Sequence, residues 1–246
     1  MIESSALSQS AGVATLGAMA GIRERVRAEL TAEIKRLARE QIATHGAADL
    51  SLRAIARDLN MASSAIYRYF DSRDHLLTAL IIDCYSDLGA VVEGADAQCS
   101  RPDLAGRWRA MSLAIRAWAL QLPHDYALIF GTPVPGYAAP NDTIASASRY
   151  TMVLLHLLTD VDSTGFVPDV AVTSAARDEC AQLRQRLGVQ IGDELLVLGL
   201  ASWTNLFGLI SFELFGHLRN VVADRDGYFA QVVDLLGRRI LPPGAA

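Results

Sequence analysis

Residues 51–70 read SLRAIARDLNMASSAIYRYF, and this stretch decides how the first third of the chain folds. Residues 52–59 and 63–70 each carry apolar side chains at helical spacing, and Asn60 between them is one of the few non-glycine residues that tolerate a positive φ angle. A helix, a short turn and a second helix form a helix-turn-helix motif, whose second helix enters the major groove of DNA. The second segment is small-sided, polar and nearly uncharged, as suits a helix that meets base edges.

The side chains expected to contact DNA are those that fit base edges or phosphate oxygens. Serine hydroxyls donate or accept hydrogen bonds, and an alanine methyl can pack on a thymine methyl. Tyrosines opposite the inward pair Ile66 and Phe70 can reach phosphates, and arginines can reach guanine edges or phosphates. The ordinary alternatives are helix caps for the serines, surface or half-buried tyrosines, and solvated arginines. The predicted DNA-binding residues are Ser51, Arg53, Ser63, Ser64, Ala65, Tyr67, Tyr69 and Arg73.

Helical periodicity continues along the rest of the chain. Apolar residues from Ile22 to Leu37 recur every three or four positions and predict a helix that ends near Gly46. A longer helix is expected to open at residues 71–74, and three prolines make residues 131–140 a loop. No segment shows the alternation of a strand, so the predicted fold class is all-α. Further helices are expected over residues 104–122, 125–130, 142–158, 168–187, 193–218 and 226–241.

This pattern predicts a flexible N-terminal tail over residues 1–20, a three-helix helix-turn-helix domain over 21–72, and a larger helical domain over 73–246 for ligand binding and dimerisation. Residues 21–75 hold ten Lys or Arg against eight Asp or Glu, whereas the whole chain has a net charge of -5. A mildly basic N-terminal third on an acidic body indicates nucleic-acid contact by one end only.

The run from residue 34 to residue 77, which ends in AIYRYFDSRDHLL, resembles the DNA-binding domain of TetR-family transcriptional regulators. Tyr67, Tyr69 and Phe70 match an aromatic block of that family, and Arg73 matches the basic residue that opens its fourth helix. The resemblance implies a DNA-binding N-terminal domain and a C-terminal domain that binds a small molecule and dimerises. It also implies a repressor that a ligand releases from a near-palindromic operator.

Two positions depart from the family pattern. Asn60 stands where the family usually has glycine, which a left-handed turn tolerates. Ala62 stands where a serine or threonine commonly caps the recognition helix, so Ser63 is expected to cap it instead. A missing cap leaves an alternative function open, in which the chain is a small-molecule binding protein with impaired DNA binding.

The segment WRAMSLAIRAWALQLPHDYALIFGTPVPG, residues 108–136, is similar to regulatory domains named for a Trp-His-Gly motif. That motif falls at Trp203, Phe207 and Gly208, where phenylalanine replaces the histidine, so the resemblance implies a largely apolar ligand. Core packing is the alternative reading for these aromatic residues, and for a histidine within an apolar helix. The predicted ligand-binding residues are Trp108, Trp118, Tyr126, Phe130, His156, Trp203 and Phe207.

Residues 195–212 contain no charged side chain, which raises the question of a membrane span. Serine, threonine and asparagine interrupt the segment, and no Lys or Arg anchors either end, so a core or subunit-interface helix is favoured over a membrane span. The two C-terminal helices of two chains could close a four-helix bundle. The predicted dimer-interface residues are Leu198, Asn205, Leu206, Leu209, Phe212, Val232 and Leu236.

Other classes of protein find little support in the sequence. Cys84, Cys99 and Cys180 are widely separated, which argues against disulfides or a zinc site and indicates a reducing compartment. No phosphate-binding loop or nucleophile motif indicates an enzyme, and a pI near 5.5 disfavours a nonspecific architectural DNA binder. We therefore expect a cytoplasmic, ligand-responsive regulator without cofactor or metal. Its expected partners are double-stranded DNA, a second copy of the chain and an unidentified small-molecule effector, with no membrane.

Overall fold

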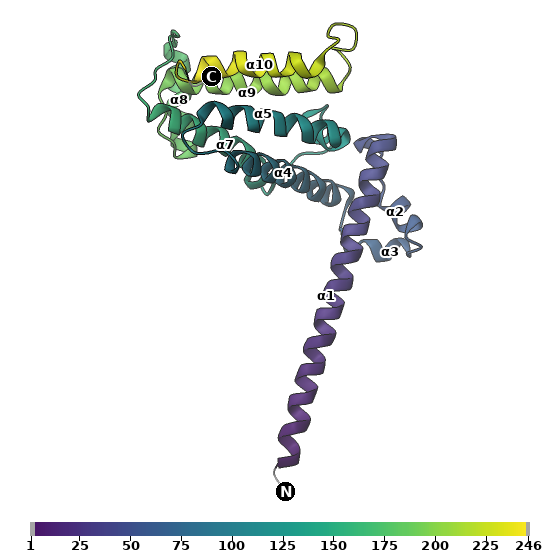
Figure 1. Ribbon diagram of the computed structural model, residues 1–246. Coiled ribbons are helices and arrows are strands. Elements are labelled where there is room, and N and C mark those ends of the chain that lie inside the picture. The colour runs from purple at the N-terminus through teal and green to yellow at the C-terminus, as the bar shows by residue number, and fades with distance from the viewer. Residues whose placement is uncertain (1–2, 245–246) are drawn as a thin grey trace. The chain divides into compact units, whose positions relative to one another are not determined.

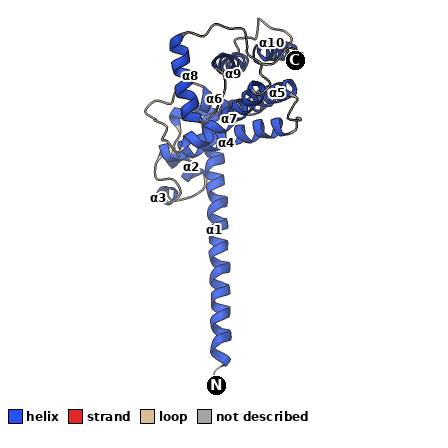
Figure 2. Cartoon of the chain, turned by 90° about the vertical axis from the view of Figure 1, so that its left-hand side faces the viewer, coloured by secondary structure: helices blue, strands red, loops and turns tan. Residues whose placement is uncertain are grey.

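The computed structural model describes residues 3–244, with side chains from residue 21, and within this range every regular element is helical (Figures 1 and 2). The all-α prediction is confirmed. The elements are α1 (Glu3–His45), the 3-10 turn η1 (Ala47–Asp49), α2 (Leu52–Asp58), α3 (Ser63–Ile66), α4 (Arg73–Ala97), α5 (Leu104–Gln121), α6 (Pro123–Phe130), α7 (Thr143–Asp162), α8 (Ser174–Leu187), α9 (Asp193–Leu214) and α10 (Arg225–Ile240).

The chain divides into two compact units. Unit 1 comprises residues 1–80 and 134–137, and unit 2 comprises residues 81–133 and 138–246. The division therefore falls inside α4, later than the boundary expected at residues 72 and 73. The first turns of α4 bury Leu76, Leu77 and Leu80. The Tyr137 hydroxyl lies 2.9 Å from Thr78 Oγ1, and this hydrogen bond joins residues 134–137 to unit 1.

Unit 1 is built on one face of the C-terminal half of α1, beside which α2 and α3 lie (Figure 1). The helix ends at His45 because Gly46 adopts a left-handed conformation with φ 84°. Apolar spacing on α1, α2 and α3 places the buried residues toward one another, as the sequence predicted. The core of the three helices consists of Ile34, Ala38, Ile42, Leu52, Ile55, Ala56, Ile66 and Phe70.

The expected flexible tail covers residues 1–20, most of which are helical in the structure. In the structure, residues 3–20 form the first turns of α1, which is one continuous helix to His45. The sequence contains no proline before residue 102, so nothing interrupts the backbone hydrogen-bond ladder of this helix. Residues 1 and 2 lie outside the described residues, and the mobility of the tail stays a prediction.

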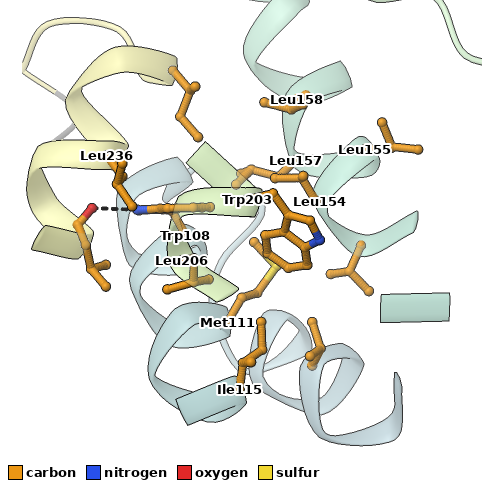
Figure 3. Close-up of a cluster of buried hydrophobic side chains, with 14 of the residues drawn as sticks. Trp108, Met111, Ile115, Leu154, Leu155, Leu157, Leu158, Trp203, Leu206 and Leu236 are labelled. Carbon is orange, nitrogen blue, oxygen red and sulfur yellow. Dashed lines mark hydrogen bonds between the residues drawn. The ribbon is translucent and has the colours of Figure 1, made fainter. Parts of the chain in front are cut away.

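Unit 2 is a helical bundle whose α5, α7, α9 and α10 share one apolar core (Figure 3). A buried arginine joins three of its helices through ion pairs. The Arg107 side chain on α5 is only 1% exposed and forms ion pairs of 2.7 Å with Asp96 on α4 and 2.6 Å with Asp160 on α7. The labelled core residues in Figure 3 are Trp108, Met111, Ile115, Leu154, Leu155, Leu157, Leu158, Trp203, Leu206 and Leu236.

Helix ends in unit 2 differ from the sequence expectations at three places. A break is expected at residues 94–102, but helix α4 continues to Ala97, and it buries Val92 whereas Val91 is exposed. Helix α8 begins at Ser174 instead of residue 168, because Thr173 caps it by accepting the backbone N–H of Ala176. Helix α9 ends at residue 214, before the expected end at residue 218.

By length and composition, α4 and α9 are long and apolar enough to cross a membrane. This criterion alone is weak evidence, because the core helix of a water-soluble bundle meets it as well. Both helices contribute buried residues to the core of unit 2, among them Leu88 on α4 and Leu206 on α9. The apolar residues of these helices thus contribute to the core of the bundle.

Candidate functional site

The turn between α2 and α3 is a left-handed helix cap built on Asn60. This residue has φ 51°, and the backbone N–H of Met61 donates to Ala56 O at 2.8 Å. The N–H of Asn60 donates to Arg57 O at 3.0 Å. These two bonds form a Schellman motif, which satisfies the last carbonyls of α2 and redirects the chain into α3. The predicted turn at Asn60 is confirmed.

Ser51 caps α2, as the sequence allowed. Its hydroxyl accepts the backbone N–H of Ala54 at 3.4 Å, and its own N–H donates to Gln41 Oε1 at 3.1 Å. The hydroxyl proton of Ser51 takes no part in either bond and remains able to donate to a phosphate oxygen.

The prediction that Ser63 caps α3 is wrong. Ala62 occupies the cap position with φ -60° and ψ 135°, no side chain caps the helix, and Ser63 is its first residue. The backbone takes this conformation because the Schellman turn fixes the entry to α3. As a consequence, the Ser63 and Ser64 hydroxyls are exposed and are not consumed by capping.

Helix α3 presents its polar side outward because two apolar residues anchor the other side. Ile66 and Phe70 are buried, whereas Ser63, Ser64 and Tyr67 are exposed, the last with 41% of its surface. Residues three and four apart lie on the same face of a helix. These three polar side chains therefore form one outward surface, which is the arrangement a major groove requires. Ala65 is half-buried, so less of it is open to a base.

Arg27 on α1 holds the end of α3, a role that the sequence analysis missed. Its Nη2 donates to Arg68 O at 3.0 Å, and its guanidinium carbon lies 5.3 Å from the centroid of the Tyr69 ring. Tyr69 is accordingly half-buried. The helical spacing indicates this role, because Arg27 lies seven residues before the buried Ile34 and therefore on the same face of α1.

Arg73 is engaged within unit 1. Its Nη2 donates to Ala47 O at 2.9 Å and to Ala48 O at 3.1 Å, and its Nη1 pairs with Asp74 at 3.0 Å. The side chain therefore ties the start of α4 to η1. Its phosphate contact stays a prediction, with fewer donors left for that purpose.

Three exposed arginines give this region its positive charge. Arg53, Arg57 and Arg68 are exposed, and no ion pair of theirs is seen within the described part of the chain. Arg36, by contrast, is neutralised by Glu33 and Glu40 on its own helix. Arg53 was predicted to contact DNA, whereas Arg57 and Arg68 were missed, although both lie opposite buried positions of their segments. Unpaired arginines beside an outward polar helix suit phosphate binding.

In unit 2, two of the predicted ligand residues are buried and hydrogen-bonded within the bundle, and their contact with a ligand stays a prediction. Trp108 is buried and its Nε1 donates to Val233 O at 2.8 Å. The buried Tyr126 bonds through its hydroxyl to Phe207 O at 3.0 Å and Ser211 Oγ at 2.8 Å. His156 is exposed, which corrects its placement in a pocket: the core face of α7 passes through the leucines on either side of it.

Three more predicted residues, Phe130, Trp203 and Phe207, belong to a set of touching rings that we call the aromatic cluster: Tyr85, Phe130, Tyr150, Trp203 and Phe207. The remaining one, Trp118, is buried and contacts Tyr126 instead. Tyr150 stacks on Trp203 with ring centroids 6.0 Å apart and on Tyr85 with centroids 6.2 Å apart. Phe207 lies 4.6 Å from Phe130 and 5.4 Å from Trp203. Sequence reasoning missed Tyr85 and Tyr150, because their helices meet only in the folded bundle.

The predicted dimer residues divide between surface and core. Leu206 and Leu236 are buried inside unit 2, which corrects their assignment to an interface, and Leu198 is half-buried. Asn205 is exposed, and its amide donates to Ala201 O on its own helix at 2.7 Å. A surface groove of about 440 Å³ between α9 and α10 is lined by Thr204, Asn205, Gly208, Leu209, Phe212, Leu218, Tyr228 and Val232.

Helix-turn-helix geometry in one unit and a larger helical bundle in the other define a class of DNA-binding transcriptional regulators. Residues 34–80 match the family described as "Bacterial regulatory proteins, tetR family". Residues 108–236 match the family described as "Tetracyclin repressor-like, C-terminal domain". The chain belongs to the TetR family.

Relatives support this assignment over most of the chain. The HTH-type transcriptional regulators Mb1846 of Mycobacterium bovis and Rv1816 of Mycobacterium tuberculosis are each 40% identical over 205 residues, which cover 80% of this chain and 85% of the relative. A crystal structure of the regulatory protein SCO4313 is 38% identical, with a TM-score of 0.73 over 87% of this chain and 97% of that one. A Rhodococcus sp. RHA1 structure at 21% identity and TM-score 0.63, covering 85% of this chain and 94% of that one, shares the fold.

Proposed function

We propose that this TetR-family chain is a cytoplasmic, homodimeric repressor, not an enzyme, that binds a near-palindromic operator and is released by a small, largely apolar ligand. The outward surface of α3 carries the proposal. Ser63, Ser64 and Tyr67 are exposed together while Ile66 and Phe70 anchor the helix from behind. An outward helix face with donors and acceptors but no pairing partners is what direct base readout needs.

Exposed arginines supply the electrostatic part of the same surface. Arg53 precedes the turn, and Arg57 and Arg68 flank it on either side. Contacts of this kind fix the position of a protein on the duplex, whereas base contacts select the sequence. The Ser51 hydroxyl, capping α2, is the further candidate for a phosphate.

The groove between α9 and α10 supports self-association. Leu209, Phe212 and Val232 leave apolar surface in this groove, and Phe212 is 55% exposed. A second copy of the same two helices would bury that surface in a four-helix arrangement with twofold symmetry. Such a dimer presents two recognition helices to major grooves about 34–36 Å apart, so the operator is expected to be a near-palindrome.

Release by a ligand requires a ligand that prefers the form unable to bind DNA. The coupling between such sites is typically about 1–3 kcal/mol. Helix α4 belongs to both units, with Leu80 in the first and Ile81 in the second, and we propose it as the element that transmits the change.

The first experiment is a titration of the purified chain into labelled DNA from its own upstream region, at two salt concentrations, with unrelated DNA as competitor. Saturable, salt-sensitive binding that survives the competitor supports a sequence-specific repressor. If binding is lost to the competitor, a genome-wide selection of bound fragments follows. Failure of that selection to enrich any sequence would favour the alternative, a small-molecule binding protein with impaired DNA binding.

A further inference from the structure

Two buried indole N–H groups in unit 2, those of Trp118 and Trp203, have no hydrogen-bond partner among the described residues, and that of Trp203 lies in the aromatic cluster. The Trp203 side chain is 5% exposed, and its indole Nε1 makes no hydrogen bond. Its neighbour Trp108 differs, because its Nε1 donates to Val233 O, the bond drawn as a dashed line in Figure 3. A buried N–H without an acceptor has lost its hydrogen bond to water and destabilises the folded protein. Such groups are rare in native structures, and they often belong to functional sites.

The surroundings of this donor resemble a binding surface more than a sealed core. Within the aromatic cluster, Trp203 is buried, but Tyr85, Phe130, Tyr150 and Phe207 are each half-buried and touch one another. The exposed parts of these adjoining rings are apolar surface in contact with water. Covering this surface with an apolar ligand is favourable. The Trp203 ring that carries the unpaired N–H packs against Tyr150 and Phe207, with ring centroids 6.0 and 5.4 Å apart.

The charged groups near the aromatic cluster indicate which ligand charge the cluster can accept. Burial raises the pKa of the Tyr85 and Tyr150 hydroxyls above the ordinary tyrosine value, so both are neutral donors near pH 7. Arg149, the neighbour of Tyr150 in the chain, is paired with Glu93 and donates to Ser86 O. Arg116 is likewise paired, with Glu213 and Asp226. An anionic ligand would therefore lose its hydration at the rings without gaining an unpaired arginine. A cationic group has no lone pair to accept the Trp203 N–H.

We propose that the aromatic cluster binds an uncharged, apolar molecule that carries one acceptor oxygen, such as a ketone, ester or ether, and that this oxygen accepts the Trp203 Nε1–H. This assignment rests on the proposed ligand-responsive function and gives its ligand a chemical class. It also gives Phe207 a role, since a histidine at that position would add a polar group beside the rings.

Equilibrium dialysis with three matched probes tests the class, because each probe is quantified by its own ultraviolet absorbance. The probes are 2-acetylnaphthalene, 2-ethylnaphthalene, which replaces the carbonyl by a methylene, and 2-naphthoate, which is anionic. For the full chain we expect the ketone to bind about three- to tenfold tighter than the hydrocarbon, the range that one neutral hydrogen bond gives. The naphthoate is expected to bind most weakly.

Trp203→Phe keeps an aromatic, though smaller, side chain and removes the donor, so it is expected to abolish the preference for the ketone. Trp118→Phe is the matched control: Trp118 is also buried at 4% exposure with an unpaired Nε1, yet it touches Tyr126 and lies outside the cluster. Retained preference in Trp203→Phe, or its loss in Trp118→Phe, would overturn the assignment to Trp203.

The comparison of ketone and hydrocarbon on the unaltered chain stands without any variant. Equal binding of the two, tighter binding of the naphthoate, or saturable binding of none of the probes refutes the proposed class. Adding the ketone to the operator titration separates this result from the proposed function. A ketone that binds through Trp203 but leaves DNA binding unchanged would contradict release by this ligand and leave the site itself standing.

Discussion

At the scale of single residues, the geometry of the recognition helix depends on side chains that do not face DNA. Asn60 turns the chain, and Ile66 and Phe70 anchor α3 from within. Arg27 holds its C-terminal end through Arg68 O. Because α3 has only four residues, it cannot be stable by its own hydrogen bonds. The order of its outward surface therefore depends on these contacts with the rest of unit 1.

Arg27→Ala is expected to weaken operator binding although Arg27 lies behind α3. The change removes a charge-assisted hydrogen bond and a cation–ring contact, together worth about 1–2 kcal/mol, so we expect an affinity loss of roughly tenfold. Arg27→Lys should recover only part of the lost affinity, because an ammonium group cannot reproduce the contact of the planar guanidinium with the Tyr69 ring. Operator titration at fixed salt is the measurement, and unchanged affinity in Arg27→Ala would show that α3 is held by its apolar anchors alone.

At the scale of elements, Arg107 joins three helices of unit 2 through its pairs with Asp96 and Asp160. Arg107→Met removes the counter-charge of the partly buried Asp96 and leaves Asp160 only the exposed Arg101, so we expect the free energy of unfolding to fall by about 3 kcal/mol. Urea denaturation monitored by circular dichroism measures it. Arg109→Met on the same helix is the control, because Arg109 pairs with Asp234 at the surface and is expected to cost below about 1 kcal/mol. Similar losses in both variants would contradict a special role for Arg107.

The α9–α10 groove gives a second prediction at this scale. Leu209→Glu is expected to yield folded monomers, because it places a charge in the surface that a second copy would bury. Leu113→Glu, at an exposed leucine of α5, should leave the dimer intact. Sedimentation velocity distinguishes the two outcomes. A dimer that survives Leu209→Glu with unchanged stability would move the interface away from the groove.

The sequence predicted the elements better than it predicted which face each one uses. Apolar spacing and the turn at Asn60 were enough for the all-α fold and for the helix-turn-helix. Helix α9, however, is apolar nearly all round, so its spacing cannot tell the buried Leu206 from the groove residue Leu209. The Arg27 contact joins residues 41 positions apart, and contacts over such separations follow from packing and not from local pattern.

At the scale of the whole molecule, the acidic chain must bring a small basic surface to DNA. With a net charge of -5, most of the protein is repelled by the phosphates, and binding depends on a few arginines at the helix-turn-helix. This balance allows rapid loss of DNA when salt rises or when contacts are misplaced. For the same reason we expect the removal of one exposed arginine to change the salt dependence measurably, although the overall charge hardly changes.

Arg53→Ala is expected to reduce both operator affinity and its salt dependence. Each phosphate contact contributes about -0.9 to the slope of log K against log salt, so a dimer that loses two such contacts should show a slope shallower by roughly 1.8. Arg186→Ala provides the control, since Arg186 is an exposed arginine of α8 in unit 2 and its removal changes the net charge equally. Titrations at four salt concentrations give both slopes. A shallower slope in the two variants alike would mean that net charge alone governs binding. An unchanged slope with lower affinity in Arg53→Ala would instead place Arg53 at a guanine edge, because a base contact carries specificity with little release of counterions.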